Sequence, residues 1–162
     1  MECKLRCFKF LTNKISEVAL ELNWIFSLDN IDWQELSDLY QIAPLGEKKP
    51  ADLEVSFSNS RYKCFVFDGG KMIGAGRALA DGIDCSYICD LAVHPEYQGF
   101  GVGKGIVSRL VDLSKSHRKI ILYSVPGKEG FYRKLGFRRM STAMAIFQNQ
   151  AQALELGLIE DT

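Results

Sequence analysis

The sequence of 162 residues has no net charge, only two histidines and no apolar run long enough to cross a membrane. Twenty basic residues balance twenty acidic ones, so the overall charge gives no reason to expect a nucleic-acid-binding protein. A transmembrane helix would need about 20 apolar residues in a row, and the N-terminal stretch MECKLRCFKFLTNK lacks the unbroken apolar segment of a signal peptide. We therefore expect a cytoplasmic protein that binds neither nucleic acid nor a membrane.

Clustered metal ligands are also scarce. The two C-x3-C pairs, Cys3 with Cys7 and Cys85 with Cys89, lie in segments that read as strands, and the only histidines of the sequence are His94 and His117. Structural zinc pairs usually lie on turns, with other cysteines or histidines nearby. An odd number of cysteines fits a reduced compartment better than a disulfide framework. We predict buried thiols and no metal.

No repeat, low-complexity tract or long linker divides the chain, and its length suits one domain. We therefore predict a single domain over residues 1–162. Residues 1–23 are predicted to supply an extra N-terminal strand. Residues 148–162 form a C-terminal tail that is predicted to be helical.

The spacing of apolar residues switches repeatedly between strand and helix periods, which indicates an α/β (α+β) fold. Alternation predicts strands, and Asp68-Gly69-Gly70 marks a hairpin turn between two of them. A nearly continuous apolar strand, residues 86–93, is followed by a helix and another strand, an order that makes those two strands parallel. The predicted strands are 4–10, 23–28, the two halves of 62–79, 86–93, 119–125 and 137–147, and the predicted helices are 33–43, 50–57, 102–116 and 128–135.

Glycine is unusually concentrated in HPEYQGFGVGKG, residues 94–105, where it takes every second position from Gly99 to Gly105. A Walker A loop ending on Gly103-Lys104 would need glycine at position 98 and Ser or Thr at 105, and the chain has Gln98 and Gly105. A dinucleotide fingerprint also fails, because no third glycine stands at the required spacing. Two interpretations remain: a diphosphate site, in which backbone N–H groups and a helix N-terminus face the phosphates, and a tight strand-to-helix turn without a ligand, which would need only one or two glycines.

At these residues the sequence resembles the GCN5-related N-acetyltransferase (GNAT) family. The family's [RQ]-x-x-G-x-[GA] motif is matched by Gln98-Gly99-Phe100-Gly101-Val102-Gly103, and the strand before it by Asp90-Leu91-Ala92-Val93-His94-Pro95. A second signature is matched by the segment from Phe131 to Phe137. The resemblance covers residues 24–147 and implies a GNAT-like fold. That fold has a central mixed sheet of about six to seven strands with a splayed parallel pair, flanked by about four helices.

The resemblance also implies a reaction: transfer of the acetyl group of acetyl-CoA, as co-substrate, to a primary amine of a small molecule or peptide. It implies that exposed backbone groups of the first splayed strand bind the pantetheine arm, and that the glycine loop holds the diphosphate. The donor-binding residues so assigned are Leu91, Ala92, Val93, Gln98, Gly99, Phe100, Gly101, Val102, Gly103, Lys104, Ser124 and Tyr132. Lys104 either pairs with a phosphate or is a solvated lysine.

Two residues are predicted to be catalytic. Tyr132 matches the family position of a general acid that protonates the leaving thiolate, the alternative being an aromatic that only packs on the sheet. Asp90 is the ready proton acceptor for the amine, although it points away from Tyr87 and Cys89 unless a bulge re-aims it. Tyr87, Cys89, a water relay, or a merely satisfied Asp90 carboxylate are the alternatives.

The resemblance further implies that residues 29–60 and the hairpin near Arg77 form the acceptor site. Acidic residues in that region favour a cationic amine, whereas Arg77 would favour an anionic group. A second function stays open, in which the chain binds acetyl-CoA as a sensor or interaction module without turnover. Apolar residues of the tail, among them Leu154 and Leu158, suggest a homodimer.

Overall fold

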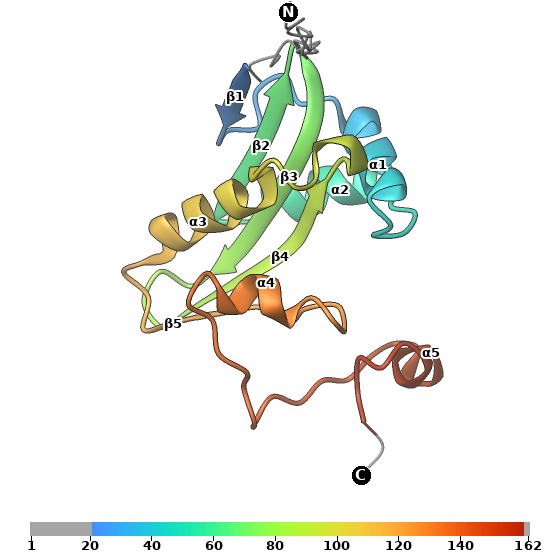
Figure 1. The fold of residues 1–162 in the computed structure, drawn as a ribbon, viewed down its shortest axis with the longest axis vertical. Helices are drawn as coiled ribbons and strands as arrows, with labels where there is room; N and C mark the ends of the chain where they lie inside the picture. Colours follow the sequence, from blue (N-terminus) through green and yellow to red (C-terminus); the bar gives the residue numbers. More distant parts are fainter. Residues whose placement is uncertain (1–20, 161–162) are drawn as a thin grey trace, which may run out of the picture.

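The computed structural model describes residues 21–160, in which five strands form one mixed sheet in the order β1-β2-β3-β4-β5 (Figure 1). Strands β1 to β4 are antiparallel neighbours, and β5 runs parallel to β4. The elements in chain order are β1 (Leu22–Ile25), α1 (Trp33–Ile42), α2 (Pro50–Ser58), β2 (Tyr62–Asp68), β3 (Lys71–Ala80), β4 (Cys85–Val93), the 3-10 helix η1 (Pro95–Tyr97), α3 (Val102–Ser114), β5 (Lys119–Ile121), α4 (Glu129–Arg133) and α5 (Gln150–Glu155).

Helices α1 and α2 cover one face of the sheet around a buried apolar cluster. Within it the rings of Phe57 and Phe65 stack with their centroids 5.1 Å apart. The carboxylate of Asp32 caps α1 by accepting backbone N–H groups of its first turn. Glu35 does not complete a capping box, because its carboxylate accepts the backbone N–H of Met72 in β3 at 2.7 Å. That bond ties the helix to the sheet.

Helix α3 covers the opposite face, with Val102, Ile106 and Leu110 buried against side chains of β2, β3 and β4. It begins inside the glycine loop, as predicted, and ends at Ser114. Close packing depends on small residues in β3, since a Cβ atom on Gly76 would lie 2.8 Å from Cγ2 of Ile106. The sheet therefore separates an α1–α2 layer from an α3 layer.

The hairpin prediction is confirmed: β2 and β3 meet at a turn in which Gly69 and Gly70 have positive φ angles. The parallel arrangement of residues 86–93 and 119–125 is confirmed as well, although β5 is only three residues long. The predicted helix in the tail corresponds to α5. The N-terminal strand predicted for residues 1–23 falls almost entirely outside the described residues.

The predicted number of strands is wrong for the described chain, which has five strands and not six to seven, with five α-helices in place of about four. The missing strand is 137–147, which is irregular and leads away from the sheet toward α5 (Figure 1). Phe137 at its start still packs against the α3 side of the sheet, but Met144 and Ile146 are 98% and 95% exposed. The short β5 offers few backbone groups with which a further strand could pair.

In the part of the chain that the structure describes, every helix is too short or too polar to cross a bilayer.

Candidate active site

Strands β4 and β5 separate after three paired positions, from Cys85 opposite Lys119 to Tyr87 opposite Ile121. Strand β4 continues to Val93 and stays paired with β3 on its other edge. Over residues 88–93, therefore, β4 has no β5 partner among the described residues. This is the splay that the resemblance implied, and it leaves one edge of the Leu91–Val93 backbone available to a ligand.

A bulge at Asp90 interrupts the register between β3 and β4. Arg77 pairs with Cys89 and Ala75 with Ala92, so Asp90 and Leu91 together oppose one residue of β3. The φ angle of Asp90 is 52°, a left-handed conformation that Asp tolerates better than most residues. The bulge turns the Asp90 side chain toward the α1–α2 layer. Without a bulge Asp90 and Cys89 would lie on opposite faces of the sheet, and with it they can lie on the same face.

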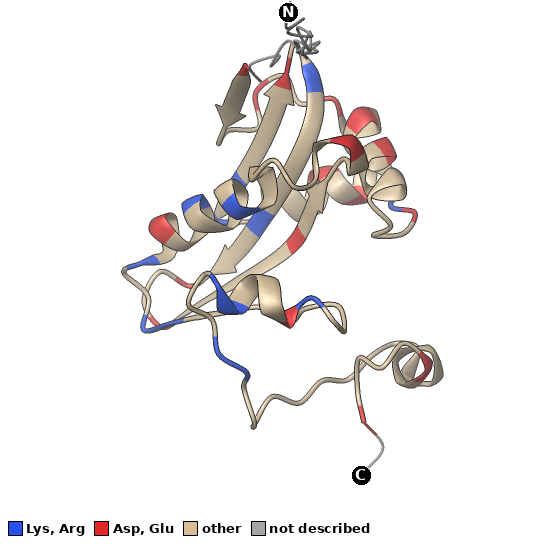
Figure 2. Cartoon of the chain, in the orientation of Figure 1, with Lys and Arg blue, Asp and Glu red and all other residues tan. Residues whose placement is uncertain are grey.

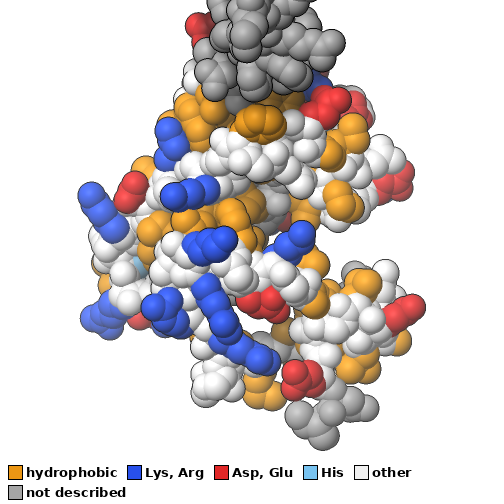
Figure 3. All heavy atoms as spheres, in the orientation of Figure 1, with side chains coloured by type: hydrophobic (Ala, Val, Ile, Leu, Met, Phe, Trp, Pro, Cys, Tyr) orange, Lys and Arg blue, Asp and Glu red, His pale blue; other side chains and the backbone are white. Residues whose placement is uncertain are grey.

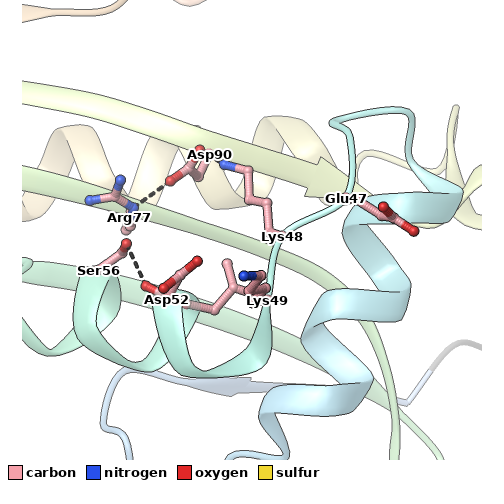
Figure 4. A pocket seen from close by; sticks show the side chains of 8 residues that line it. Glu47, Lys48, Lys49, Asp52, Ser56, Arg77 and Asp90 are labelled. Atoms are coloured by element: carbon pink, nitrogen blue, oxygen red, sulfur yellow. Dashed lines mark hydrogen bonds and ion pairs between the residues drawn. The ribbon is translucent and has the colours of Figure 1, made fainter. Parts of the chain in front are cut away.

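The Asp90 carboxylate is fully engaged there (Figure 4). Lys48 Nζ lies 2.5 Å from Oδ1, and Arg77 Nε lies 2.5 Å from Oδ2. Arg77 also donates to the Ser60 hydroxyl at 3.1 Å, and the Tyr40 hydroxyl donates to the backbone carbonyl of Asp90 at 2.8 Å. Burial alone would raise the pKa of Asp90, but Lys48 and then Arg77 hold the pKa of this carboxyl below its ordinary value. Asp90 is thus a stable anion and a weak proton acceptor.

The two other candidate bases on β4 hold their protons tightly. Burial raises the pKa of the Cys89 thiol to about 11, although the charge of Arg77 acts in the opposite direction. Burial also raises the pKa of Tyr87, and the neighbouring Tyr123 adds to the effect. The rings of Tyr87 and Tyr123 stack with centroids 6.1 Å apart, at the point where β4 and β5 part. At neutral pH neither side chain is ready to take a proton.

A cavity of about 320 Å³ opens beside this charged group, between the start of α2 and the bulge (Figure 4). Its walls carry three basic and three acidic side chains together with two uncharged ones. The lining residues are Glu47, Lys48, Lys49, Asp52, Leu53, Ser56, Arg77 and Asp90. The cavity therefore lies where the resemblance placed the acceptor.

The glycine loop lies at the N-terminus of α3. Gly99 and Gly101 both have φ 86°, and a Cβ atom on either would meet nothing within 4 Å, so the space before them is open. Gly101 is the N-cap of α3 and provides no side-chain cap, so the N–H groups of the first turn remain available to a ligand. Gly105 has a different role, since a Cβ there would lie 2.6 Å from the Trp24 ring.

Only the backbone of several predicted donor residues can reach a ligand. The Val102 side chain is buried in the core, and Ala92 is buried in the α1–α2 layer. Phe100, by contrast, is 69% exposed. The Gln98 amide donates to the Val93 carbonyl at 3.1 Å and so ties the loop to the end of β4.

The outer face of α3 and α4 is basic. Figure 2 shows Lys and Arg along α3, around α4 and in the segment after it, and Figure 3 shows their side chains gathered on this face. Lys104 is exposed in the first turn of α3 and makes no ion pair with residues 21–160. The residues concerned are Lys104, Arg109, Lys128, Arg133, Lys134, Arg138 and Arg139. The positive electrostatic potential of this face attracts a polyphosphate.

Tyr132 lies on α4 and is half-buried, and burial raises the pKa of its phenol. Its ring packs edge-on against Phe131 and Phe137, with centroids 5.0 and 6.1 Å away. Phe131 in turn lies 3.7 Å from the point where a Cβ on Gly103 would stand, so α4 adjoins the glycine loop. Ser124 is half-buried in the segment that follows β5.

The structure also assembles residues that the sequence did not single out: Tyr40, Lys48 and Ser60. Tyr40 lies on the buried face of α1 and Lys48 in the α1–α2 connection, and they reach Asp90 across 50 and 42 residues of chain. Nothing in the local run Glu47-Lys48-Lys49 distinguishes one lysine from the other. These contacts all lie in the described part of the chain, residues 21–160. Within that chain no group of His, Cys, Asp and Glu could hold a metal ion.

Comparison with known proteins yields consistent matches. The sequence profile of the acetyltransferase (GNAT) family matches residues 25–137. An uncharacterized N-acetyltransferase ycf52 of Porphyra purpurea is 35% identical over 135 residues, which cover 79% of this chain and 78% of that protein. Serotonin N-acetyltransferase 2, chloroplastic, of Oryza sativa subsp. japonica is 38% identical over 88 residues, 51% of this chain and 44% of the rice protein. A GNAT family acetyltransferase structure from Streptococcus pneumoniae superimposes with a TM-score of 0.68 at 25% identity, covering 80% of this chain and 98% of that one.

Proposed function

This chain belongs to the acetyltransferase (GNAT) family, and on that premise we propose that it transfers the acetyl group of acetyl-CoA to the primary amine of a small molecule. The observation that carries the proposal is the parting of β4 from β5 after Tyr87, beside the open N-terminus of α3. Backbone groups are therefore available both on the edge of β4 and at the start of α3. A donor with an amide-containing arm and a polyphosphate end would bind the first group of atoms with its arm and the second with its phosphates.

The backbone edge of Leu91–Val93 would hydrogen-bond the pantetheine arm and polarise the acetyl carbonyl. A fixed donor of this kind is worth about 3 kcal/mol where one has been removed from an enzyme. The loop from Gln98 to Lys104 would hold the diphosphate through the N–H groups at the start of α3, and the exposed Lys104 would add a charge. Gly99 and Gly101 fit this role because the space before them is open.

Tyr132 would act as the general acid. A phenol with a raised pKa keeps its proton at neutral pH and can donate it to the thiolate that leaves the acetyl carbon. Bound acetyl-CoA supplies the activated acyl group, and the chain supplies positioning and this proton. The packing of Tyr132 between Phe131 and Phe137 supports the role, since it fixes the ring.

For the general base, the geometry favours a water relay over the three side chains. Asp90 is held as a weak base by two cations, and the raised pKa values of Tyr87 and Cys89 keep both protonated. Freeing an alkylamine with a pKa near 10.4 costs about 5 kcal/mol at pH 7, and a water chain gives the released proton a path to bulk solvent. The sequence prediction of Asp90 as base stays a prediction, and we propose instead that Asp90 is an electrostatic anchor.

The acceptor would enter from the α1–α2 layer. The name of the rice relative specifies serotonin, and the stacked pair Tyr87 and Tyr123 offers a flat aromatic surface at the splay. Arylalkylamines are therefore the first class to test. Localisation in the cytoplasm stays a prediction, since that same relative is named chloroplastic.

The deciding experiment is thiol release from acetyl-CoA in the presence of arylalkylamines, polyamines, amino sugars and short peptides, with the acetylated product identified by mass spectrometry. We expect at least one primary amine to raise thiol release well above the rate without acceptor. If acetyl-CoA raised the melting temperature while no amine in the panel raised thiol release, the alternative of a sensor without turnover would replace the enzyme.

For assembly, we propose a homodimer that covers the C-terminal segment. Met144 and Ile146 are almost fully exposed, and β5 is an edge strand of the described sheet. In a twofold dimer, the C-terminal segment of each copy can pack against the β5 edge of the other copy. Both segments and both edges are then covered by the same contact.

A further inference from the structure

The ammonium group of Lys48 lies against the Asp90 carboxylate at the wall of the cavity (Figure 4). Its Nζ is 2.5 Å from Oδ1 of Asp90 and 5.0 Å from the centroid of the Tyr40 ring. A carboxylate on one side and an aromatic face on the other are two groups that recognise a primary ammonium ion. The same side chain forms part of the wall of the acceptor cavity.

Asp90 links this ammonium to the part of β4 at which we propose that the acetyl donor binds. Asp90 stands at the bulge, directly before the backbone edge of Leu91–Val93. The bulge sends the Asp90 side chain into the α1–α2 layer, where Lys48 meets it, while Leu91 and Val93 contact the α3 layer. An ammonium ion bound to Asp90 therefore lies in the α1–α2 layer, at the residue that directly precedes the strand edge to which the proposed function assigns the acetyl arm.

Of the two cations on Asp90, Lys48 is the replaceable one. The Lys48 side chain is 31% exposed, whereas the Arg77 side chain is 15% exposed and is held further by Ser60. The Lys48 carbonyl accepts a hydrogen bond of 2.6 Å from the Ser37 hydroxyl. The lysine side chain can therefore swing away while its backbone stays in place, and Arg77 keeps the carboxylate ionised in the meantime.

We propose that Lys48 is an internal competitor of the acceptor: the substrate's ammonium group displaces the Lys48 ammonium from Asp90 and takes its place over the Tyr40 ring. This inference rests on the proposed function and narrows it. The acceptor is a primary amine on an unbranched methylene chain, because the site that it takes over is filled by such a group. An anionic acceptor bound by Arg77 is not expected, since Asp90 already neutralises that residue.

Lys49 provides a matched control. It lines the same cavity with the same charge but forms no ion pair with the described residues. Lys48→Met and Lys49→Met therefore remove an identical charge from one cavity, and only the first frees a binding position. An effect of overall charge would appear in both variants, whereas release of the position would appear in one.

The experiment titrates n-butylamine into the wild type and both variants, and follows binding by ligand-observed NMR. We expect Lys48→Met to lower the Kd about tenfold, the ratio that corresponds to 1.4 kcal/mol, and Lys49→Met to leave it unchanged. Asp90→Asn added to Lys48→Met should abolish the gain, since it removes the carboxylate and keeps its shape. Lys48→Gln repeats the test with a polar replacement if Lys48→Met proves unstable.

Three outcomes would overturn the inference: an unchanged Kd in Lys48→Met, an equal fall in Lys49→Met, or no detectable binding of n-butylamine to any variant. The test is independent of turnover. A lower Kd in Lys48→Met combined with no acetylation of any amine would uphold the ammonium site and remove the proposed activity. Acetylation by the wild type with an unchanged Kd in Lys48→Met would do the reverse.

Discussion

Replacing Asp90 by Asn tests whether this residue is an anchor or a base. Asn has nearly the shape of Asp and also tolerates the φ angle of 52° found at this position. The substitution therefore changes the charge at the bulge and little else. It leaves the cations of Lys48 and Arg77 facing a neutral amide.

The expected loss of stability follows from burial. Removing one partner of a fully buried ion pair costs about 3–5 kcal/mol, and an exposed pair contributes about 0–1 kcal/mol. Asp90 and Arg77 are 16% and 15% exposed, and Lys48 is 31% exposed. An intermediate value of about 2–3 kcal/mol is therefore expected, once solvent screening at Lys48 is allowed for. In a chain of this size that lowers the Tm by about 4–12 °C.

The pH dependence gives the sharper measurement. The pKa of Asp90 in the folded protein is lower than its ordinary value, so its contribution is fully present above the unfolded-state pKa of about 3.9 and is lost as the pH falls through the folded pKa. Urea unfolding of wild type and Asp90→Asn should therefore show a constant difference from pH 7 to pH 5. Below about pH 4 the difference should shrink, since a protonated Asp resembles Asn.

A difference of less than about 0.5 kcal/mol at pH 7, the range of an ordinary surface substitution, would refute the anchor. So would a difference that does not change on acidification. The rate separates the two roles further. Loss of a general base would lower kcat about 100-fold or more and remove the acidic limb of the pH–rate profile, whereas loss of an anchor should leave that limb in place.

Three further substitutions test other parts of the molecule. Tyr132→Phe should lower kcat about 100-fold with the Kd for coenzyme A unchanged, and the wild-type rate should persist to pH 10, because burial raises the pKa of the phenol; an unaltered kcat would remove Tyr132 from the mechanism. Gly105→Ala should lower the Tm, because its Cβ would approach the Trp24 ring to 2.6 Å, with little change in coenzyme affinity. Gly101→Val should weaken coenzyme binding at least tenfold in calorimetry, and it should also lower the Tm because valine is strained at the φ of 86° found there; equal effects of the two changes on affinity would contradict the different roles given to these glycines. Met144→Glu should convert a dimer to a monomer in light scattering, and a wild type that is already monomeric would refute the proposed assembly.

The glycine loop, where we propose that the donor binds, could be predicted from the sequence because its determinants are local. A glycine loop between a strand and a helix can be read within a dozen residues, and the loop and the start of α3 lie where the sequence predicted them, whereas the splay was implied by the family resemblance. One detail was not accessible. The four glycines look alike in sequence, but Gly105 makes room for Trp24, which lies 81 positions earlier and on another element (105 − 24 = 81).

The acceptor side could not be predicted in the same way, because its contacts join distant residues. Tyr40 has the spacing of a core residue, and only the tertiary structure brings its hydroxyl to the Asp90 carbonyl. The position of the bulge at Asp90 could not be predicted either, since an Asp in the left-handed conformation has no sequence signal comparable to a glycine. The strand predicted over residues 137–147 is wrong for a related reason. Alternation of apolar and polar residues indicates that a segment can form a strand, but it gives no information about which sheet edge is available to pair with it.

The sheet keeps the two halves of the site on opposite layers, with α3 on one side, α1 and α2 on the other, and only the kink at Asp90 reaching across. For protein engineering this means that the α1–α2 connection can be exchanged or lengthened without changing the glycine loop that is proposed to bind the coenzyme. A library restricted to residues 43–56 would sample new acceptors on an unchanged acetyl donor platform. Position 48 would then be the first position to vary, because under the proposal the side chain there determines whether the acceptor position on Asp90 is already occupied before a substrate binds.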